Sequence, residues 1–478
     1  MVNKKEFGFL LLFVTAYSYL IFPIEYLPEE RYLFYADTKN KSEESKEEMM
    51  RRIFYRNIMT TVEIGTPPRN VTMILDSDDD RHFFASNKRP KISNEPYHEA
   101  KYYKFDLDEL LNETESSTYK KGPCEAVDYN VFHYAEICTS KDNIIFHHKG
   151  QTSEKTFEFK LVRNNEDNIP GLIGLLYNFK NTNTKFPNFI NELRAQNLID
   201  NNYWFFNFDK VSPFNRDLQG QLVIGALPHD IFPEKFKKSN FIEIKKAKKA
   251  HFHGSWKIEF DKIFIDDKDY EYLLYNTVCS LNYEMYPIIG SLEFHFRIKE
   301  KFLEDMLEEK RCFSGTFHQN VVLAKELTFY YCNKTEKEFL YKAIPNMKFY
   351  LEEFGQMFEL TKEELFYEKG DYIYFMIFFG GITFNYFSLG QMFTTKFNFV
   401  FNTFYQEIGF YKTENSKGIM EKKIKSNEIP YLYIVIVLIP FISLFVGFLI
   451  GKTVFGKRTK KQNAKELNEE KDSSINEV

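Results

Sequence analysis

Acidic residues gather directly after a mostly apolar run in the first quarter of the chain. Asp76 follows residues 71–75, and Asp78, Asp79 and Asp80 come after a single serine. Carboxylates that lie close together disfavour each other's ionisation, so such a group can hold a proton and take part in acid–base chemistry. An acidic turn on the protein surface would give the same pattern, and both interpretations stay open.

The residues before Asp76 predict a β-hairpin that would hold it in place. Thr60, Val62 and Ile64 alternate with polar residues, residues 65–68 favour a turn, and residues 71–75 form the next strand. Further strand-like runs recur at residues 144–146, 157–162, 203–208, 222–224, 258–265 and 397–401, whereas the best helix candidates are residues 189–198 and 302–309. The predicted fold class is therefore mainly β.

Residues 60–86 (TTVEIGTPPRNVTMILDSDDDRHFFAS) resemble the first active-site hairpin of pepsin-like aspartic proteases, in which a G-T-P-P turn and a strand lead into D-T-G-S-S. Other segments resemble motifs of that family in the same order: residues 116–119, 170–175, 189–199, 203–208, 220–226, 256–258, 263–265, 344–349, 389–391, 400–402 and 408–410. The resemblance covers residues 55–411. It implies a bilobal pepsin-like acid protease fold.

In that family two carboxylates, one from each lobe, share a proton; one activates a water and the other protonates the scissile carbonyl oxygen. The resemblance places Asp76 at the first position, although Ser77-Asp78 replaces the Thr-Gly that should follow. For the second lobe the best match is residues 287–294 (PIIGSLEF), where Gly290 takes the place of the aspartate. Glu293 is a poor substitute because it falls later in the loop and would point elsewhere.

These replacements predict a catalytically impaired member of the family. Tyr129 is the best candidate for the tyrosine that closes over substrate, but Asn-Val-Phe-His follows it where the family has a Gly-rich turn. The favoured function is a pseudoprotease that binds a peptide or protein in the interlobe cleft. The alternative is an active aspartic endopeptidase with an atypical dyad. Neither interpretation requires a metal or a cofactor.

The two ends of the chain predict entry into the secretory pathway and a membrane anchor. Lys4 and Lys5 precede an apolar run, in the order of a secretory signal. Residues 429–450 contain no charged residue and are long enough to cross a bilayer as one helix. Lysines and an arginine after this segment favour a cytosolic tail. We therefore expect a single-pass type I protein of the secretory pathway or plasma membrane.

The cysteines and sequons fit a lumenal body. The short loops between Cys124 and Cys138 and between Cys312 and Cys332 suit disulfides, with Cys279 left over, although buried free thiols would also fit. Sequons for N-glycosylation stand at Asn40, Asn70, Asn112 and Asn333.

Composition and charge set the outer limits. The 478 residues are 44% hydrophobic, enough for a large core, and a net charge of −5 gives no general electrostatic reason to bind nucleic acid. The expected order is a signal peptide (1–22), a linker or pro-segment (23–54), an N-terminal lobe (55–240), a C-terminal lobe (241–415), a juxtamembrane linker (416–428), a transmembrane helix (429–451) and a cytosolic tail (452–478).

Overall fold

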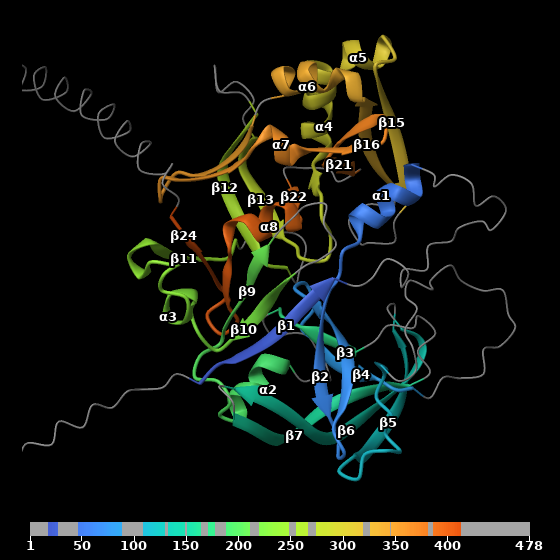
Figure 1. The fold of residues 1–478 in the computed structure, drawn as a ribbon, viewed down its shortest axis with the longest axis vertical. Coiled ribbons are helices and arrows are strands. Elements are labelled where there is room, and N and C mark those ends of the chain that lie inside the picture. The colour runs from blue at the N-terminus through green and yellow to red at the C-terminus, as the bar shows by residue number, and fades with distance from the viewer. Residues whose placement is uncertain are drawn as a thin grey trace, which may run out of the picture. The chain divides into compact units, whose positions relative to one another are not determined.

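Alternation of apolar and polar residues makes most of the folded body β-structure, as the sequence predicts (Figure 1). In β2 (Ile58–Ile64), Thr61 is exposed between buried neighbours, and β3 (Arg69–Asp76) buries residues 71–75. The computed structural model describes residues 18–26, 46–87, 109–129, 132–148, 151–163, 171–176, 188–210, 219–247, 255–265, 274–318, 326–344, 346–380 and 386–412. The mainly-β class is confirmed, and it is consistent with a pepsin-like fold.

The first sheet joins segments from both ends of the chain. Its thirteen strands have the order β11-β24-β23-β9-β10-β1-β2-β3-β8-β4-β7-β6-β5. Besides β2 and β3 they are β1 (Leu20–Tyr26), β4 (His82–Ala85), β5 (Lys120–Tyr129), β6 (Phe132–His148), β7 (Gln151–Arg163), β8 (Gly171–Gly174), β9 (Tyr203–Lys210), β10 (Gln219–Ile224), β11 (Phe241–Lys245), β23 (Val400–Asn402) and β24 (Glu407–Tyr411).

The second sheet is built from the middle and later parts of the chain. Its order is β18-β17-β12-β13-β22-β14-β21-β16-β20-β19, and β15 pairs with β16. The strands are β12 (Lys257–Phe264), β13 (Leu274–Leu281), β14 (Ile288–Gly290), β15 (Cys312–His318), β16 (Glu326–Asn333), β17 (Met347–Leu351), β18 (Gln356–Leu360), β19 (Phe366–Lys369), β20 (Tyr372–Phe375), β21 (Ile377–Gly380) and β22 (Tyr386–Leu389).

The helices are short. They are α1 (Lys46–Phe54), α2 (Phe189–Ala195), α3 (Pro228–Ile231), α4 (Leu292–Ile298), α5 (Glu304–Glu308), α6 (Lys337–Ala343), α7 (Lys362–Leu365) and α8 (Gln391–Phe397), with η3 (Lys238–Asn240), η5 (Lys334–Glu336) and the π-helical turn η4 (Lys299–Leu303). Both predicted helix segments contain helix. The predicted strand at residues 397–401 is wrong in its first half, because Phe397 ends α8 and β23 begins only at Val400.

A shared aromatic core joins the two sheets. Trp204 of β9 and Trp256, which precedes β12, lie 6.2 Å apart with their rings at 69°, and Phe401 stacks on Trp204 at 4.2 Å. Trp256 also donates its indole N–H to the Leu175 carbonyl oxygen over 3.4 Å. Both tryptophans are fully buried. This core fixes the ends of β3 and β13, which carry the candidate site.

Both predicted disulfides are confirmed. Cys124 on β5 is bonded to Cys138 on β6, and Cys312 on β15 is bonded to Cys332 on β16. Each bond joins directly opposed residues of neighbouring strands. Cys279 is a free, buried thiol on β13, as the odd number of cysteines requires.

The N-terminal boundaries differ from the prediction. Residues 20–22, assigned to the signal peptide, begin β1, which pairs with β10 and, through Tyr26, with Ile58 of β2. Leu20, Phe22 and Ile24 are buried, so these residues belong to the sheet. The expected linker 23–54 also holds the rest of β1 and helix α1. The earlier signal-like residues 1–17 lie outside the described part of the chain.

No helix in the described ranges is long and apolar enough to cross a membrane. The predicted span at residues 429–451, the linker before it and the tail after it all lie outside those ranges. Membrane anchoring therefore stays a prediction from the sequence.

Candidate active site

Asp76 ends β3 at a close approach of two backbone segments. β3 runs parallel to β8, with Asp76 opposite Gly174. Leu175 donates its backbone N–H to the Asp76 carbonyl oxygen, and Gly174 donates to that of Arg81, each over 2.7 Å. A Cβ at Gly174 would lie 2.5 Å from the carbonyl oxygens of Asp79 and Arg81, so glycine is required here. The loop after Asp76 is thus folded tightly over β8.

The second sheet repeats this arrangement with β13 and β22. These strands also run parallel, and Leu281 lies opposite Leu389, so Asn282 follows at the level of Gly390. Asn282 donates its backbone N–H to the Leu389 carbonyl oxygen over 2.9 Å. A Cβ at Gly390 would lie 2.2 Å from the carbonyl oxygen of Pro287, in the loop after Asn282, so glycine is again required. By strand register, Asn282 is the counterpart of Asp76.

The two loops that follow share a local hydrogen bond. Asp76 Oδ1 accepts the backbone N–H of Asp78 over 2.8 Å, and Asn282 Oδ1 accepts that of Glu284 over 2.7 Å. The next strand begins six residues after Asp76 at β4 (82 − 76) and six residues after Asn282 at β14 (288 − 282). Asp78 and Glu284 therefore occupy equivalent places in the two loops.

The structure corrects the assignment of the second position to Gly290. Gly290 ends β14, where it pairs with Phe379 of β21, and β14 corresponds to β4, the strand after the active-site loop. The apolar Pro-Ile-Ile run had the character of the strand before the loop, but it belongs to the strand after it. Glu293 is exposed on α4 and forms an ion pair with Arg297 at 2.5 Å, so it does not supply a second catalytic carboxyl group.

The equivalent loops exchange side-chain contacts across the two sheets. The carboxyl groups of Asp76 and Glu284 share a hydrogen bond. The Asn282 side-chain amide donates to Asp78 Oδ2 over 3.1 Å. Asp76 thus contacts Glu284, which stands two residues after Asn282. In the same way Asn282 contacts Asp78, which stands two residues after Asp76. A second carboxyl group does lie beside Asp76, and it comes from Glu284.

A buried contact at the intervening residues reinforces the junction. The backbone N–H of Tyr283 donates to Ser77 Oγ over 3.3 Å, and both residues are almost completely buried. Tyr283 also packs its ring against Phe206 of β9, with ring centroids 4.7 Å apart. The loops are therefore held together by backbone as well as by side chains.

Burial makes protons an integral part of this site. It is the main cause that raises the pKa of Asp76, and it raises the pKa values of Asp78 and Glu284 well above their usual range. The charge of Asp76 raises the pKa values of Asp78 and Glu284 further. Burial also lowers the pKa of Lys257, which faces Asp78. The Asp76–Glu284 pair is accordingly suited to hold one proton between two carboxyl oxygens.

Arg81 is committed to a different acid. Its Nε donates to both Asp79 oxygens, over 2.8 and 2.7 Å, and its Nη2 also contacts Asp79. This ion pair compensates the charge of Asp79 within the loop itself. The charge of Arg81 also lowers the pKa of Asp76, against the larger effect of burial.

Comparison with known protein families matches residues 57–413 to the family described as eukaryotic aspartyl protease. The chain belongs to this family. No curated protein matches the sequence. The family assignment agrees with the repeated strand register around Asp76 and Asn282 and confirms the resemblance found in the sequence.

This chain departs from the aspartyl protease pattern at three positions of the two loops. Asp76 keeps the first position, Asn282 replaces the acid of the second, and Asp78 and Glu284 stand where the two loop glycines belong. Sequence reasoning missed Asn282 and Glu284. A signal was present, because Asn282 follows an apolar strand end and precedes the next strand by the same six residues as Asp76 does.

The candidate flap residue is only partly described. Tyr129 is the last residue of β5 and lies opposite Phe132, the first residue of β6. Residues 130–131, which join the two strands, lie outside the described ranges. A clamping role for Tyr129 therefore stays a prediction.

The sequons also remain predictions. Asn70 is exposed on β3, whereas Asn112 and Asn333 are partly exposed and Asn40 lies outside the described residues. The Asn112 side-chain amide donates to Glu115 over 2.6 Å, so a glycan there would displace that contact.

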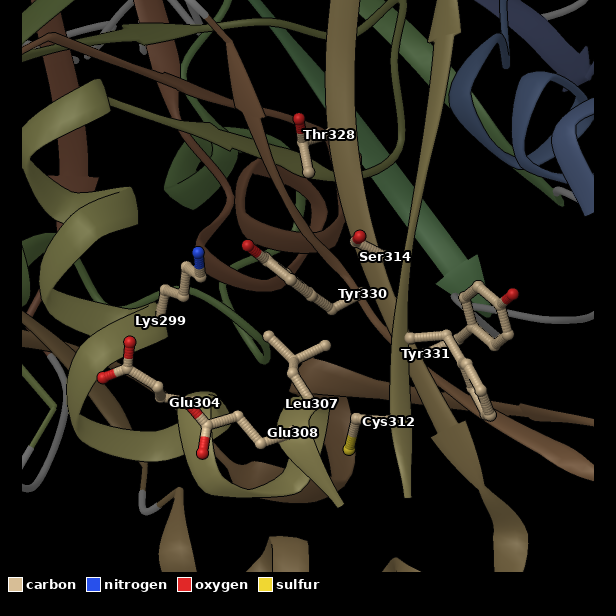
Figure 2. Close-up of a pocket in the computed structure, with 10 residues that line it drawn as sticks. Lys299, Glu304, Leu307, Glu308, Cys312, Ser314, Thr328, Tyr330 and Tyr331 are labelled. Carbon is tan, nitrogen blue, oxygen red and sulfur yellow. The ribbon is translucent and has the colours of Figure 1, made fainter. Parts of the chain in front are cut away.

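Figure 2 shows a pocket of about 590 Å³ that lies apart from the two loops. Its lining comes from η4, α5, β15 and β16: Lys299, Glu304, Leu307, Glu308, Cys312, Phe313, Ser314, Thr328, Tyr330 and Tyr331. The glutamates lie at one end and the Thr328 hydroxyl at the other. Among the described residues, the one group with metal-ligand spacing is Cys124, Glu136 and Cys138, whose two thiols are consumed by a disulfide.

Proposed function

We propose that this chain is a membrane-anchored aspartyl protease homologue that binds a peptide or protein and no longer hydrolyses it by the paired-aspartate mechanism. The observation that supports the proposal is the side-chain amide of Asn282 at the register position of the second sheet that is equivalent to that of Asp76. An amide cannot ionise or exchange the proton that the two carboxylates of the family share. The reaction that depends on that exchange loses one of its two groups.

The acids at the glycine positions support the same proposal. Glycine lets the backbone approach the dyad closely, whereas Asp78 and Glu284 bring side chains into that space. Both side chains are engaged with the opposite loop, Asp78 with Asn282 and Glu284 with Asp76. These contacts place two acidic side chains between the loops, at positions where the family has glycine and therefore no side chain.

One observation favours a second candidate, an active endopeptidase with an atypical dyad. The hydrogen-bonded carboxyl groups of Asp76 and Glu284 can share a proton, and the pKa of each is raised by burial. In such an enzyme Asp76 would activate the water and Glu284 would protonate the carbonyl oxygen. Glu284 would then replace the missing acid from a position two residues further along the loop.

Location in the secretory pathway is part of the proposal and rests on the sequence. The signal-like N-terminus and the uncharged residues 429–450 support a type I anchor. Disulfides in both sheets support exposure of the folded body to an oxidising compartment.

Peptide cleavage by the full-length protein in detergent micelles tests the two candidates. We expect no pepstatin-sensitive cleavage of a peptide library between pH 3 and pH 7, and we expect Asp76→Ala to remain folded. Cleavage that is abolished by both Asp76→Ala and Glu284→Gln, but retained in Glu293→Gln, would establish the atypical dyad. Glu293 is the matched control because it is an exposed acid of the same sheet region.

A further inference from the structure

The turn between β23 and β24 carries two adjacent aromatic side chains on the protein surface. Phe404 is 70% and Tyr405 is 59% exposed, and their ring centroids lie 4.8 Å apart. The other large hydrophobic side chains that are exposed in the described ranges, Phe296 on α4 and Phe339 on α6, stand singly along the chain. Neighbouring aromatic rings in water are unfavourable, and such a pair is typical of a surface that meets an apolar partner.

Hydrogen bonds hold this turn in place. Oδ1 of the buried Asn402 accepts the backbone N–H groups of Phe404 and Tyr405, each over 3.2 Å. Thr403 donates its backbone N–H to the Asn202 carbonyl oxygen over 3.1 Å, and its hydroxyl donates to the same oxygen over 3.2 Å. The folded body therefore presents the two rings on an ordered turn.

The strand that begins after this turn leads to the predicted membrane anchor. β24 pairs with β11, the edge strand of the first sheet, and its five residues span roughly 15 Å at about 3.3 Å per residue (Figure 1). Lys412 follows β24, and sixteen residues (428 − 412) separate it from residue 429, a distance of at most about 58 Å when fully extended. The β24 edge is thus the part of the described body nearest to the anchor along the chain.

Exposed lysines gather at the end of β24 from which the chain continues. Lys412 donates its backbone N–H to the Asn240 carbonyl oxygen over 2.9 Å, and Asn240 ends η3, which begins at Lys238. Lys237, Lys238 and Lys412 are all exposed. Aromatic rings and lysines are enriched where proteins meet the membrane interface, because the rings reach the headgroup level and the ammonium groups meet lipid phosphates. The chemistry of this edge therefore matches a bilayer surface.

We propose that the β23–β24 turn inserts Phe404 and Tyr405 into the interface of the bilayer that holds the anchor, with the three lysines beside the lipid phosphates. The inference rests on the proposed membrane anchor and goes beyond it, since an anchor joined by a linker leaves the side on which the body lies undetermined. Insertion of the turn makes the β11–β24 edge the face of the body that lies against the membrane.

An added tryptophan tests the insertion. The chain has two tryptophans, both fully buried, so a surface tryptophan adds a separate emission. Tyr405→Trp in the whole chain is reconstituted into phosphatidylcholine vesicles with and without lipid brominated in the upper acyl chain. We expect brominated lipid to reduce the added emission at least about twofold, because interfacial rings lie at that depth. Phe296→Trp is the matched control, since Phe296 is 60% exposed on α4, and its emission should not change.

Alkaline carbonate extraction of the same vesicles separates the two ways in which the inference can fail. Protein that stays in the bilayer while Tyr405→Trp emits equally with and without bromine would overturn the insertion and leave the anchor standing. Protein that leaves the bilayer would overturn both the inference and the proposed anchor.

A second pair of variants tests whether the rings hold the body to the surface. Energy transfer from the buried Trp204 and Trp256 to dansyl-labelled headgroups reports how close the body lies to the bilayer. Phe404→Ser with Tyr405→Ser should lower this transfer, because the body is then held only through its linker, whereas Phe296→Ser should leave it unchanged. Both changes are at exposed positions, so both proteins should remain folded. Equal transfer in the double variant and the wild type would contradict the inference.

Discussion

At the level of single residues, this chain departs most from the aspartyl protease pattern where acids replace the two loop glycines. Asp78 and Glu284 stand in equivalent places and cross to the opposite loop. Their burial raises their pKa values, so folding costs the ionised forms free energy. The site should therefore be a source of pH-dependent instability.

The variant Glu284→Gln should show this cost. An acid with a raised pKa binds more protons in the folded state than in the unfolded state, so its contribution to stability falls as the pH rises from its usual value through the raised one. Glutamine lacks this titration but can still donate to Asp76. We expect the variant to unfold a few degrees higher than the wild type near pH 7 and at a similar temperature near pH 4.

Thermal unfolding of the full-length protein at both pH values measures this effect. Glu293→Gln serves as the control, since that acid is exposed and removing it should leave the pH profile unchanged. If Glu284→Gln is less stable than the wild type at pH 7, the charge of Glu284 stabilises the folded state, which contradicts the prediction.

The sequence revealed only one side of the site, for a physical reason. Asp76 could be found because a turn and a strand immediately before it form a local pattern. Position 282 holds asparagine in place of the second aspartate of the family. Its assignment depends on β13 running parallel to β22, which is a pairing of distant segments. The contact of Glu284 with Asp76 depends in addition on how the two sheets pack. The packing of the two sheets leaves no local trace in the sequence, and the spacing of six residues after Asn282 was the only local signal for this side of the site.

Among the elements, β1 covers residues that the sequence analysis divided between the expected signal peptide and the linker. Its apolar residues have the character of a signal sequence, yet Leu20, Phe22 and Ile24 alternate with less buried neighbours and face the core. Ile24 lies opposite Gly220 of β10, and a Cβ on Gly220 would come within 3.3 Å of its side chain. Short apolar strands and signal segments cannot be told apart by hydrophobicity alone.

The place of β1 predicts where a signal peptidase would cut. Cleavage after residue 22 would remove three of the seven residues of β1, which pairs with β10. We expect the mature N-terminus at or before Ser18, whose backbone N–H donates to Asp200. N-terminal sequencing of the protein from its native membrane checks this, and a first residue beyond Ile24 would mean that the mature body lacks β1.

A charge inside β1 should unfold the first sheet. Ile24→Asp buries an unpaired carboxylate at a position that is 5% exposed, and we expect a loss of about 3 kcal/mol or more. The adjacent Glu25→Gln, on the exposed face, is the matched control and should change little. Denaturant unfolding of both variants measures the difference in the free energy of unfolding. Equal values would show that β1 does not unfold together with the rest of the sheet.

The disulfide of the second sheet should contribute strongly to stability. Cys312 and Cys332 enclose a loop with a sequence separation of 20 residues, for which chain entropy suggests about 3 kcal/mol. We expect Cys312→Ser with Cys332→Ser to lose about this much in denaturant unfolding. The free Cys279→Ser is the control, although it fills a buried site and must be checked for its own packing cost.

For the whole molecule, the first sheet is the feature that makes one folded body from distant segments. β23 near residue 400 pairs with β9 near residue 205, and β1 from the N-terminal end pairs with β10. The sequence motifs placed most of these strands in the right order, because each strand has a local pattern. The motifs could not show that these strands share one sheet, because their pairing joins residues about two hundred apart in the chain.

Membrane topology is the last prediction, and it follows from the order of the segments. The signal-like N-terminus should deliver the folded body to the lumen, and residues 429–450 should stop transfer, leaving the basic residues after Lys452 in the cytosol. Both disulfides lie in the folded body, as expected for an oxidising lumen. Protease added outside sealed microsomes should therefore remove only the tail, and glycosidase should shift the protected fragment if the exposed Asn70 carries a glycan. Digestion of the body with protection of the tail would reverse the predicted orientation.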